Sequence, residues 1–178
     1  MAGKTDKQFL FEVQLNWRAG TSGILSAKDA NGSIIVATPP PFGGEGNQWT
    51  PEHLFLSSIS SCFMTTYLAF AKKLHFEIAD FRCDAIGQIE IIKRKYKFTH
   101  INLYPIVYIA EESLRTKANL ALEKTHRHCL VANSVNAIIF YHSQILVAAG
   151  ARHEMEDTTG LNAVFSSANA QSFTNNTS

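Results

Sequence analysis

The sequence predicts an α+β protein in which antiparallel sheets pack against two main helices. Two observations carry this prediction: short segments with the two-residue alternation of β-strands, and two longer segments whose apolar residues recur at helical spacing. The expected order is three strands, a helix, two strands, a second helix and a closing strand. We expect one domain over residues 1–150 and a loose polar tail over residues 151–178, which has little to bury.

The N-terminal part predicts a small antiparallel sheet. Apolar and polar residues alternate over residues 8–17, which indicates a half-buried strand. Two further β-rich runs, 23–28 and 33–38, flank Asn31-Gly32, a pair that favours a hairpin turn. The prolines and glycines of residues 39–49 then predict a loop, because proline removes ladder donors and glycine adds backbone freedom.

The clearest helix start in the chain lies at Thr50-Pro51-Glu52. Threonine suits the N-cap, proline suits the first helical position, and an acidic side chain in the first turn favours the helix dipole. From Phe55 onward the apolar residues follow helical spacing, and Cys62 lies within this stripe. We therefore expect a mostly buried helix over residues 51–70.

The second half predicts a long hairpin followed by a helix. Residues 76–92 and 97–109 are rich in β-formers and surround a basic turn at 93–97. Gly87 predicts a bulge in the first of these strands. A second helix begins near Glu111, acidic at its start and basic at its end, as the helix dipole favours.

Cys129 lies where the second helix ends. A short helical turn over residues 133–137 and a closing strand over 138–149 are expected to follow. The three cysteines in all are an odd number, which favours free thiols over a disulfide framework.

Composition excludes several classes of function. The 178 residues are 46% hydrophobic and 17% charged, which fits one globular domain. The net charge of +1 does not indicate a basic surface that would bind nucleic acid. No run of about 18 apolar residues indicates a membrane span. We expect a soluble, cytoplasmic protein without nucleic-acid or membrane partners.

Cys62 and Cys129 are the candidate reactive groups. A cysteine attacks only as a thiolate, and burial raises its pKa, so Cys62 either has a charge-stabilising neighbour or is a small apolar residue of the core. Arg18, at the end of the first strand beside Gly20, could supply a guanidinium where the chain turns. Cys83 matches no such pattern and is expected to be structural.

Three segments together resemble the OsmC/Ohr family of thiol-dependent peroxidases, and the resemblance covers residues 8–148. They are Trp17-Arg18-Ala19-Gly20, the run Thr50-Pro51-Glu52-His53-Leu54-Phe55 leading to Ser61-Cys62-Phe63, and His128-Cys129-Leu130-Val131-Ala132-Asn133-Ser134. Their order, a Pro-Glu pair ten residues before the first cysteine and a second cysteine 67 residues later make the match specific.

The resemblance implies a function in oxidative-stress defence. It implies that Cys62 attacks an organic hydroperoxide, that Cys129 resolves the sulfenic acid into a disulfide, and that Arg18 paired with Glu52 activates Cys62. It also implies an intertwined homodimer, no cofactor, and an external reductant such as small thiols or the dihydrolipoyl group of a lipoylated protein.

The chain departs from the family's pattern after the second cysteine. Leu130 and Ala132 stand where the family usually has proline and serine, which leaves the disulfide step less certain than thiol attack. An apolar entrance for the peroxide could be formed by Phe42, Trp49, Phe55 and Phe63, each of which could equally be core.

Helix geometry sets a condition on the active site. In one straight helix Glu52 and Cys62 lie about 15 Å apart along the axis, at about 1.5 Å per residue. Either the helix breaks between them, or the Arg18 and Glu52 that serve one Cys62 come partly from a second subunit.

Two rival interpretations stay open, and a third is set aside. His126, His128, Cys129 and Cys62 could bind zinc or another soft metal, although their spacing lacks a Cys-x-x-Cys knuckle. The fold could also serve as a non-catalytic binding module for an apolar ligand. A serine hydrolase is not indicated, because the chain has no Gly-x-Ser-x-Gly elbow.

Overall fold

The structure, a computed structural model, describes residues 7–148; the predicted tail, 151–178, lies outside them. A first antiparallel sheet has the order β1-β2-β3, with β1 at Gln14–Ala19, β2 at Ser22–Ser26 and β3 at Ile34–Ala37. A short 3-10 turn, η1 (Pro40–Phe42), follows within the predicted loop.

The predicted first strand is displaced. We expected residues 8–17, but β1 begins at Gln14, whose partner Ser26 is the last residue of β2. A strand exists only where a neighbour completes its ladder, and residues 8–13 pair with nothing in the described chain. Between β2 and β3 the chain uses a seven-residue connection instead of a tight Asn-Gly turn, and of that pair only Gly32 has a positive φ, 83°.

The predicted first helix is confirmed as α1, Pro51–Lys73, 23 residues without a break, but it is not mostly buried: only Ile59, Phe63, Tyr67 and Ala71 are. Its start is a capping box: the Thr50 hydroxyl accepts from the N–H of His53 at 3.3 Å, and the His53 ring accepts from the N–H of Thr50 at 3.3 Å. The cap fixes the direction in which the helix leaves the loop.

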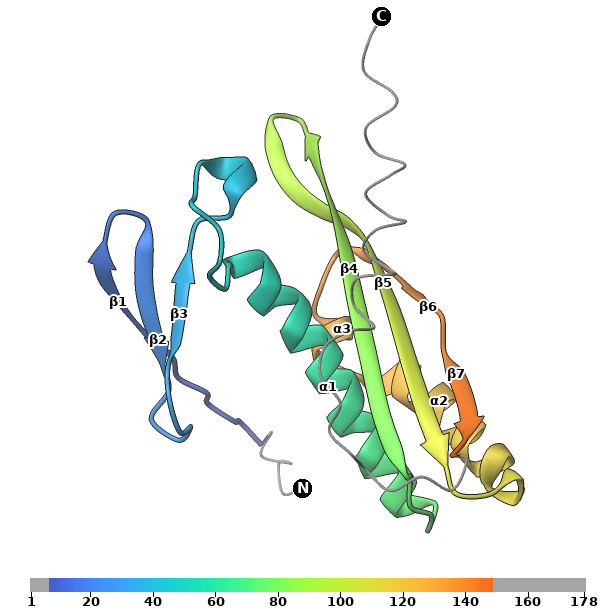
Figure 1. Cartoon of the computed structure of the whole chain (residues 1–178). Coiled ribbons are helices and arrows are strands. Elements are labelled where there is room, and N and C mark those ends of the chain that lie inside the picture. The colour runs from blue at the N-terminus through green and yellow to red at the C-terminus, as the bar shows by residue number, and fades with distance from the viewer. Residues whose placement is uncertain (1–6, 149–178) are drawn as a thin grey trace, which may run out of the picture. The chain divides into compact units, whose positions relative to one another are not determined.

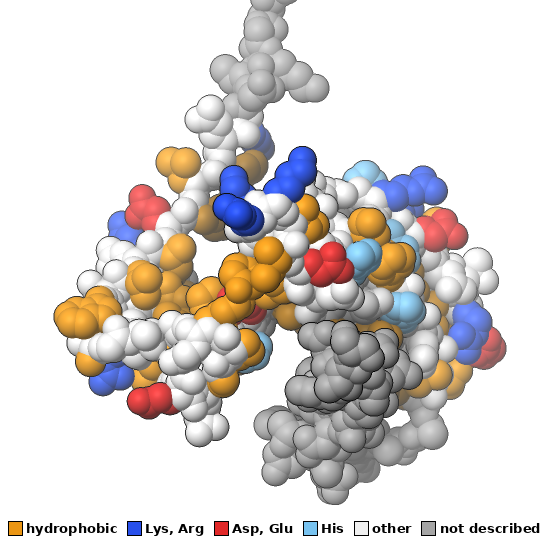
Figure 2. All heavy atoms as spheres, turned by 90° about the horizontal axis from the view of Figure 1, so that it is seen from above, with side chains coloured by type: hydrophobic (Ala, Val, Ile, Leu, Met, Phe, Trp, Pro, Cys, Tyr) orange, Lys and Arg blue, Asp and Glu red, His pale blue; other side chains and the backbone are white. Residues whose placement is uncertain are grey.

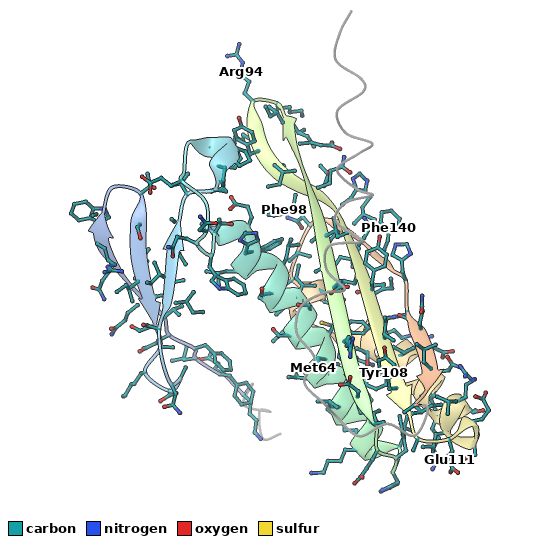
Figure 3. The ribbon with its side chains drawn as sticks, in the orientation of Figure 1. Met64, Arg94, Phe98, Tyr108, Glu111 and Phe140 are labelled. Atoms are coloured by element: carbon teal, nitrogen blue, oxygen red, sulfur yellow. The ribbon has the colours of Figure 1, made fainter. Side chains whose placement is uncertain are left out.

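The predicted long hairpin consists of β4 (Asp80–Ile92) and β5 (Lys95–Ile109), paired antiparallel. Its turn is tighter than the predicted basic segment 93–97, because only Lys93 and Arg94 lie between the strands. Both have positive φ, 49° and 62°, as a two-residue hairpin turn of the right twist requires. Figure 3 shows Arg94 at the tip.

The expected bulge lies one residue beyond Gly87. The register shifts between Gln88 and Ile89, so that Thr99 of β5 is the extra residue. Gly87 itself is required for packing, since a Cβ there would lie 2.6 Å from the Phe98 ring and 2.8 Å from Leu56 of α1.

The C-terminal elements are shorter and more numerous than expected. In order they are η2 (Glu112–Leu114), α2 (Arg115–His128), α3 (Leu130–Asn133), β6 (Ile138–Tyr141) and β7 (Gln144–Val147). The helical turn predicted at 133–137 thus begins earlier, directly after Cys129. The expected closing strand, 138–149, is split into β6 and β7, and both run parallel to β5. The helices between β5 and β6 carry the chain back, so β6 and β7 run in the same direction as β5. With the antiparallel β4–β5 pair, this makes the second sheet mixed. The α+β class is confirmed.

The helices cover one face of the second sheet, with α1 against β4 and α2 against β5 (Figure 1). The core holds buried apolar residues from α1, β5, α2 and β7: Ile59, Phe63, Tyr67, Ile101, Leu103, Val107, Ile109, Ala118, Ala121, Leu122 and Ile145. Within residues 7–148, α1 is the one helix long and apolar enough to span a membrane by composition. Here it serves as a core helix.

Candidate active site

The structure brings two of the predicted site residues together, Cys62 and Cys129. Cys62 lies in the middle of α1 and is half-buried, while Cys129 lies between α2 and α3 and is fully buried. The packing of α3 against α1 places the N–H of Val131 3.5 Å from the Cys62 sulfur, to which it donates. The Cys129 thiol also lowers the pKa of Cys62.

These contacts set the pKa of Cys62. Burial alone would raise it, but the hydrogen bonds from the Val131 backbone, the Cys129 thiol and the Thr66 hydroxyl outweigh burial, with a smaller contribution from the Leu130 backbone. The pKa of Cys62 therefore lies below the ordinary value for a thiol. Its sulfur is 4.0 Å from the Thr66 oxygen. A half-exposed thiol with a lowered pKa is suited to act as a nucleophile.

The pKa values of the other two cysteines, Cys129 and Cys83, are raised. Burial, reinforced by the charge that Cys62 would carry, raises the pKa of Cys129 to about 11. Burial first, then the neighbouring Asp84, raises the pKa of Cys83 to about 12. Both thiols are thus neutral at physiological pH. All three thiols belong to one core cluster, in which Cys129 is buried and Cys62 and Cys83 pack against it.

Three aromatic rings, from α1, α2 and β6, pack together in the region of the two cysteines. Phe63 contacts the rings of His126 and Tyr141 at centroid distances of 5.6 and 5.5 Å, and His126 stacks on Tyr141 at 4.2 Å. Burial lowers the pKa of His126, against a smaller opposing effect of Glu123. Because His126 is half-buried and its pKa is lowered, the imidazole stays neutral near pH 7.

The described chain does not assemble the metal site considered above. Within residues 7–148 no group of three or more histidine, cysteine, aspartate or glutamate side chains could hold an ion. The ring of His126 packs on Phe63 and Tyr141, and that of His128 lies 5.6 Å from Phe70. The packing of these two rings explains the histidines without a metal.

Glu52 lies away from the two cysteines. Since α1 has no break, the condition set by helix geometry holds, and Glu52 is about 15 Å from Cys62 along the axis. Its Oε2 atom is buried and has no hydrogen-bond partner among the described residues. A buried carboxylate oxygen without a donor is costly, which points to a missing cation or donor at this position.

Arg18 is exposed in β1, and neither ion pair formed within residues 7–148 includes it. The turn that follows is held by the Trp17 indole, which donates to the Gly20 carbonyl at 3.0 Å, and Gly20 has a φ of 52°. The described chain therefore presents Arg18 outward and leaves Glu52 unpaired, so the predicted Arg18–Glu52 pair does not form within it.

The four aromatic residues expected at the entrance do not share one pocket. Phe42 and Glu52 line a cavity of about 400 Å³ whose other walls are Ile89, Tyr96, Lys97 and Phe98. Trp49 lines a separate hollow of about 340 Å³, Phe55 stacks on Phe98 at 4.7 Å, and Phe63 is fully buried. Phe42 and Glu52 also line an apolar cavity of about 540 Å³ against the first sheet.

Most of the region that holds the two cysteines matches a known protein family. The sequence profile of the OsmC-like proteins matches residues 44–142, that is 99 of the 178 residues. The chain belongs to the OsmC-like protein family. The matched region contains Glu52, Cys62 and Cys129, and Arg18 precedes it.

Related proteins share the fold of this OsmC-like chain at low identity. The uncharacterized protein YmaD of Bacillus subtilis is 18% identical over 143 residues, 79% of this chain and 95% of YmaD. Two solved structures have a TM-score of 0.62 and 18% identity: an OsmC-like protein of unknown function from Vibrio cholerae (79% of this chain, 100% of that one) and an organic hydroperoxide resistance protein from Legionella pneumophila (80% and 100%). The family thus includes proteins named for hydroperoxide resistance.

Sequence reasoning missed the groups that contact the Cys62 sulfur in this OsmC-like protein. The N–H of Val131 and the hydroxyl of Thr66 are its neighbours. Thr66, four residues after Cys62 on the same helical face, was open to prediction from helical spacing. The Val131 amide was not, because a backbone donor has no signature in the side-chain sequence.

Proposed function

We propose that the chain is a thiol-dependent peroxidase that reduces organic hydroperoxides, with Cys62 as the nucleophile. The observation that carries the proposal is the arrangement at Cys62, a half-exposed thiol that accepts a hydrogen bond from the Val131 amide and whose pKa is lowered by this amide and by the Cys129 thiol. In a family that includes organic hydroperoxide resistance proteins, this arrangement favours peroxide chemistry.

The reaction divides into two steps. The Cys62 thiolate attacks the outer oxygen of ROOH, the O–O bond breaks, and the alkoxide takes a proton to leave as ROH, so that Cys62 becomes a sulfenic acid. The Cys129 sulfur then attacks the Cys62 sulfur and releases water, which forms a disulfide and completes a two-electron oxidation of the protein. An external dithiol, such as a dihydrolipoyl group, returns both cysteines to thiols.

Arg18 and Glu52 would assist the first step from a second subunit. A guanidinium beside Cys62 favours the thiolate and then the departing alkoxide, and a carboxylate holds the guanidinium fork in place. Because α1 is unbroken and Arg18 is exposed and forms no ion pair within residues 7–148, this part of one chain does not assemble the set. The unpartnered Oε2 atom of Glu52 supports completion across a homodimer interface.

The surface of the first sheet supports a homodimer. The alternating apolar residues that predicted the first strand are 63% to 91% exposed: Phe9, Phe11, Val13, Leu15 and Trp17. Figure 2 shows hydrophobic side chains on the part of the surface formed by the N-terminal strands. Apolar residues with strand periodicity need a covering surface, and in a homodimer a second copy supplies it.

A second candidate function rests on the cavity of about 540 Å³ between the first sheet and the start of α1. Apolar residues such as Leu15, Trp17 and Val36 form much of its wall, which would suit an apolar ligand without any chemistry at Cys62.

A cytoplasmic location is part of the main proposal, because the enzyme needs the thiol reductants that the cytoplasm maintains.

Intact-mass analysis without reductant, after one equivalent of cumene hydroperoxide, tests the proposal. We expect the wild type to lose two hydrogens and Cys129→Ser to gain one oxygen, while Cys62→Ser stays unchanged. No mass change in wild type or Cys129→Ser would exclude the peroxidase and favour the ligand-binding alternative. An oxygen gained by Cys62→Ser would assign the attack to another thiol.

A further inference from the structure

The segment that follows Cys129 presents backbone N–H groups to the Cys62 sulfur. α3 is only Leu130–Asn133, and its first intrahelical bond runs from the N–H of Asn133 to the carbonyl of Cys129 at 3.0 Å. The N–H groups of the three residues before Asn133 precede the first acceptor of the helix and need partners elsewhere. One of them, on Val131, donates to Cys62 at 3.5 Å.

We propose that the peptide amides of Leu130 and Val131 activate Cys62, by holding its sulfur in the thiolate form from within the same chain. This inference rests on the proposed peroxidase and adds a second source of activation to the Arg18–Glu52 set. Amide donors suit this role because a hydrogen bond to a charged acceptor is stronger than one to a neutral acceptor, so it favours the thiolate over the thiol.

The electrostatics of the thiol pair agree with this geometry. After burial, which raises the pKa of Cys62, the Val131 backbone is the largest influence and acts in the opposite direction, and the Leu130 backbone adds to it. The Ala132 and Val131 amides lower the pKa of Cys129 in the same way, but there burial prevails. The Val131 amide therefore lowers the pKa of both thiols, and only that of the less buried one, Cys62, falls below its ordinary value.

The departure from the family's pattern at Leu130 gains a physical meaning. A proline at this position would carry no N–H, whereas leucine supplies one directly before Val131, whose amide donates to the Cys62 sulfur. The Leu130 side chain itself is 69% exposed and buries little apolar surface. The contribution of this position to the site thus comes from its amide.

Local geometry makes a selective deletion of this amide feasible. Leu130 is the first residue of α3, a position where proline fits well. Cys129 has φ −64° and ψ 111°, an extended conformation that the residue before a proline can adopt. Leu130→Pro and Leu130→Ala both lack the leucine side chain, and the proline variant alone also lacks the N–H, so the two form a matched pair.

The test is the rate of alkylation of Cys62 by iodoacetamide from pH 5 to 10, followed by peptide-mapping mass spectrometry in both variants. We expect Leu130→Pro to react about threefold or more slowly than Leu130→Ala at pH 7, with its midpoint moved to higher pH, because fewer molecules carry the thiolate. Identical pH profiles in the two variants would overturn the inference.

A second measurement covers the case in which Leu130→Pro does not fold. In the wild type, the 1H and 15N resonances of the Val131 and Leu130 amides should titrate with the midpoint of Cys62 alkylation, and this titration should vanish in Cys62→Ser. Amide resonances that titrate identically in Cys62→Ser would overturn the inference. Neither readout uses peroxide, so a protein without peroxidase activity could still show the amide effect, and the two failures are distinguishable.

Discussion

At the scale of single residues, the two thiols of the candidate site differ in exposure more than in partners. Backbone amides of the 130–132 segment lower the pKa of both thiols, yet Cys62 is half-buried and Cys129 is fully buried. Desolvation therefore decides which sulfur is charged, because burial penalises the charged form. In the proposed mechanism, this difference makes Cys62 the attacking thiol and leaves Cys129 neutral until the later step.

Selective alkylation follows from these pKa values. At pH 7 iodoacetamide should modify Cys62 first, and Cys129 and Cys83 at least tenfold more slowly, because burial raises their pKa to about 11 and about 12. Peptide mapping at partial modification measures the order. In urea all three should react at similar rates, which is the control. Equal labelling in the native protein would contradict the assignment of Cys62.

Removing the proposed activating charges should slow the reaction with peroxide. We expect Arg18→Met and Glu52→Gln each to lower kcat/KM for cumene hydroperoxide by about 10²-fold, since each removes electrostatic stabilisation of the departing alkoxide. Stopped-flow oxidation of the protein measures the effect. Arg94→Met, which removes an arginine at the hairpin tip (Figure 3), is the control. Unchanged kcat/KM in both variants would exclude their role.

At the scale of elements, α1 packs closely against the β4–β5 hairpin through a glycine. Gly87 leaves room for Leu56 of α1 and for Phe98, which in turn stacks on Phe55. This contact holds the first half of α1, and with it Glu52, at one side of the 400 Å³ cavity. The glycine is thus part of what positions the site.

Gly87→Val should destabilise the fold by about 1–3 kcal/mol, because the added side chain would force Phe98 and Leu56 apart. Urea unfolding followed by circular dichroism measures the change. Leu56→Ala combined with Gly87→Val should recover part of the loss, since the two sites are in contact. Strict additivity of the two substitutions would show that the clash does not arise at Leu56.

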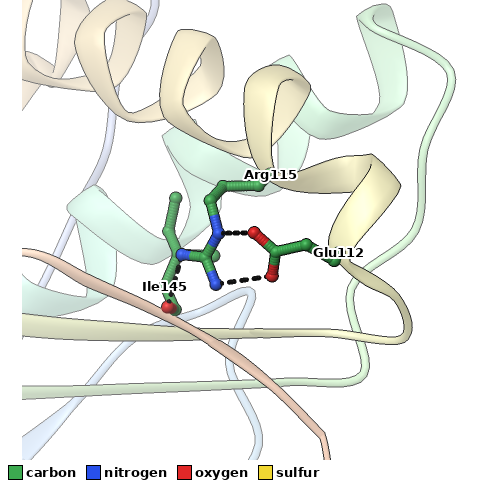
Figure 4. A network of polar contacts seen from close by, with 3 residues as sticks. All are labelled: Glu112, Arg115 and Ile145. Carbon is green, nitrogen blue, oxygen red and sulfur yellow. Dashed lines mark hydrogen bonds and ion pairs between the residues drawn. The ribbon is translucent and has the colours of Figure 1, made fainter.

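A second contact between elements fixes the edge strand β7. The Arg115 guanidinium donates to the Ile145 carbonyl at 2.9 Å and binds both carboxylate oxygens of Glu112 (Figure 4). The ion pair is exposed and contributes little by itself. The bond to Ile145 matters more, because it joins the start of α2 to a strand of only four residues.

Arg115→Gln should therefore increase amide hydrogen exchange in β7 several-fold, with little change in β4 and β5. Exchange measured by mass spectrometry of peptides covering 144–147 gives the readout. Arg127→Gln, an exposed arginine on the same helix, should leave that exchange unchanged. Unaltered β7 exchange in Arg115→Gln would show that parallel pairing with β5 alone holds the strand.

At the scale of the whole molecule, the described chain leaves an apolar surface exposed to solvent and a buried carboxylate oxygen without a hydrogen-bond partner. The residues 8–13 and β1 expose an alternating apolar face, and the Oε2 atom of Glu52 has no partner among residues 7–148. A single arrangement, in which a second copy covers the apolar face and brings Arg18 to Glu52 or Cys62, would satisfy both.

We expect a homodimer at micromolar concentration, which sedimentation velocity would measure. Phe11→Asp combined with Leu15→Asp should produce monomers, because it places charge on the exposed apolar face. These monomers should lose peroxidase activity by about 10²-fold if the partner supplies Arg18 or Glu52. Leu120→Asp, on α2, is the control for an added charge. A fully active monomer would exclude a site shared between subunits.

The sequence by itself determined the α+β class, the start of α1 and the identity of the candidate thiols. These follow from local physics: the cap at Thr50, the alternation of β-strands and the helical spacing around Cys62. The strand pairing could not be predicted this way. The parallel return of β6 and β7 and the early end of the β1 ladder depend on which neighbours are available to complete hydrogen bonds.

Only the tertiary structure decided what surrounds Cys62. The contact of α3 with α1 places the Val131 amide and Cys129 at its sulfur, although 69 residues separate Cys62 from Val131 in the chain. It also showed that α1 is unbroken, so that Glu52 is remote from Cys62 within one chain. Backbone donors and distances between distant segments leave no trace in a residue pattern, because they depend on how the segments pack.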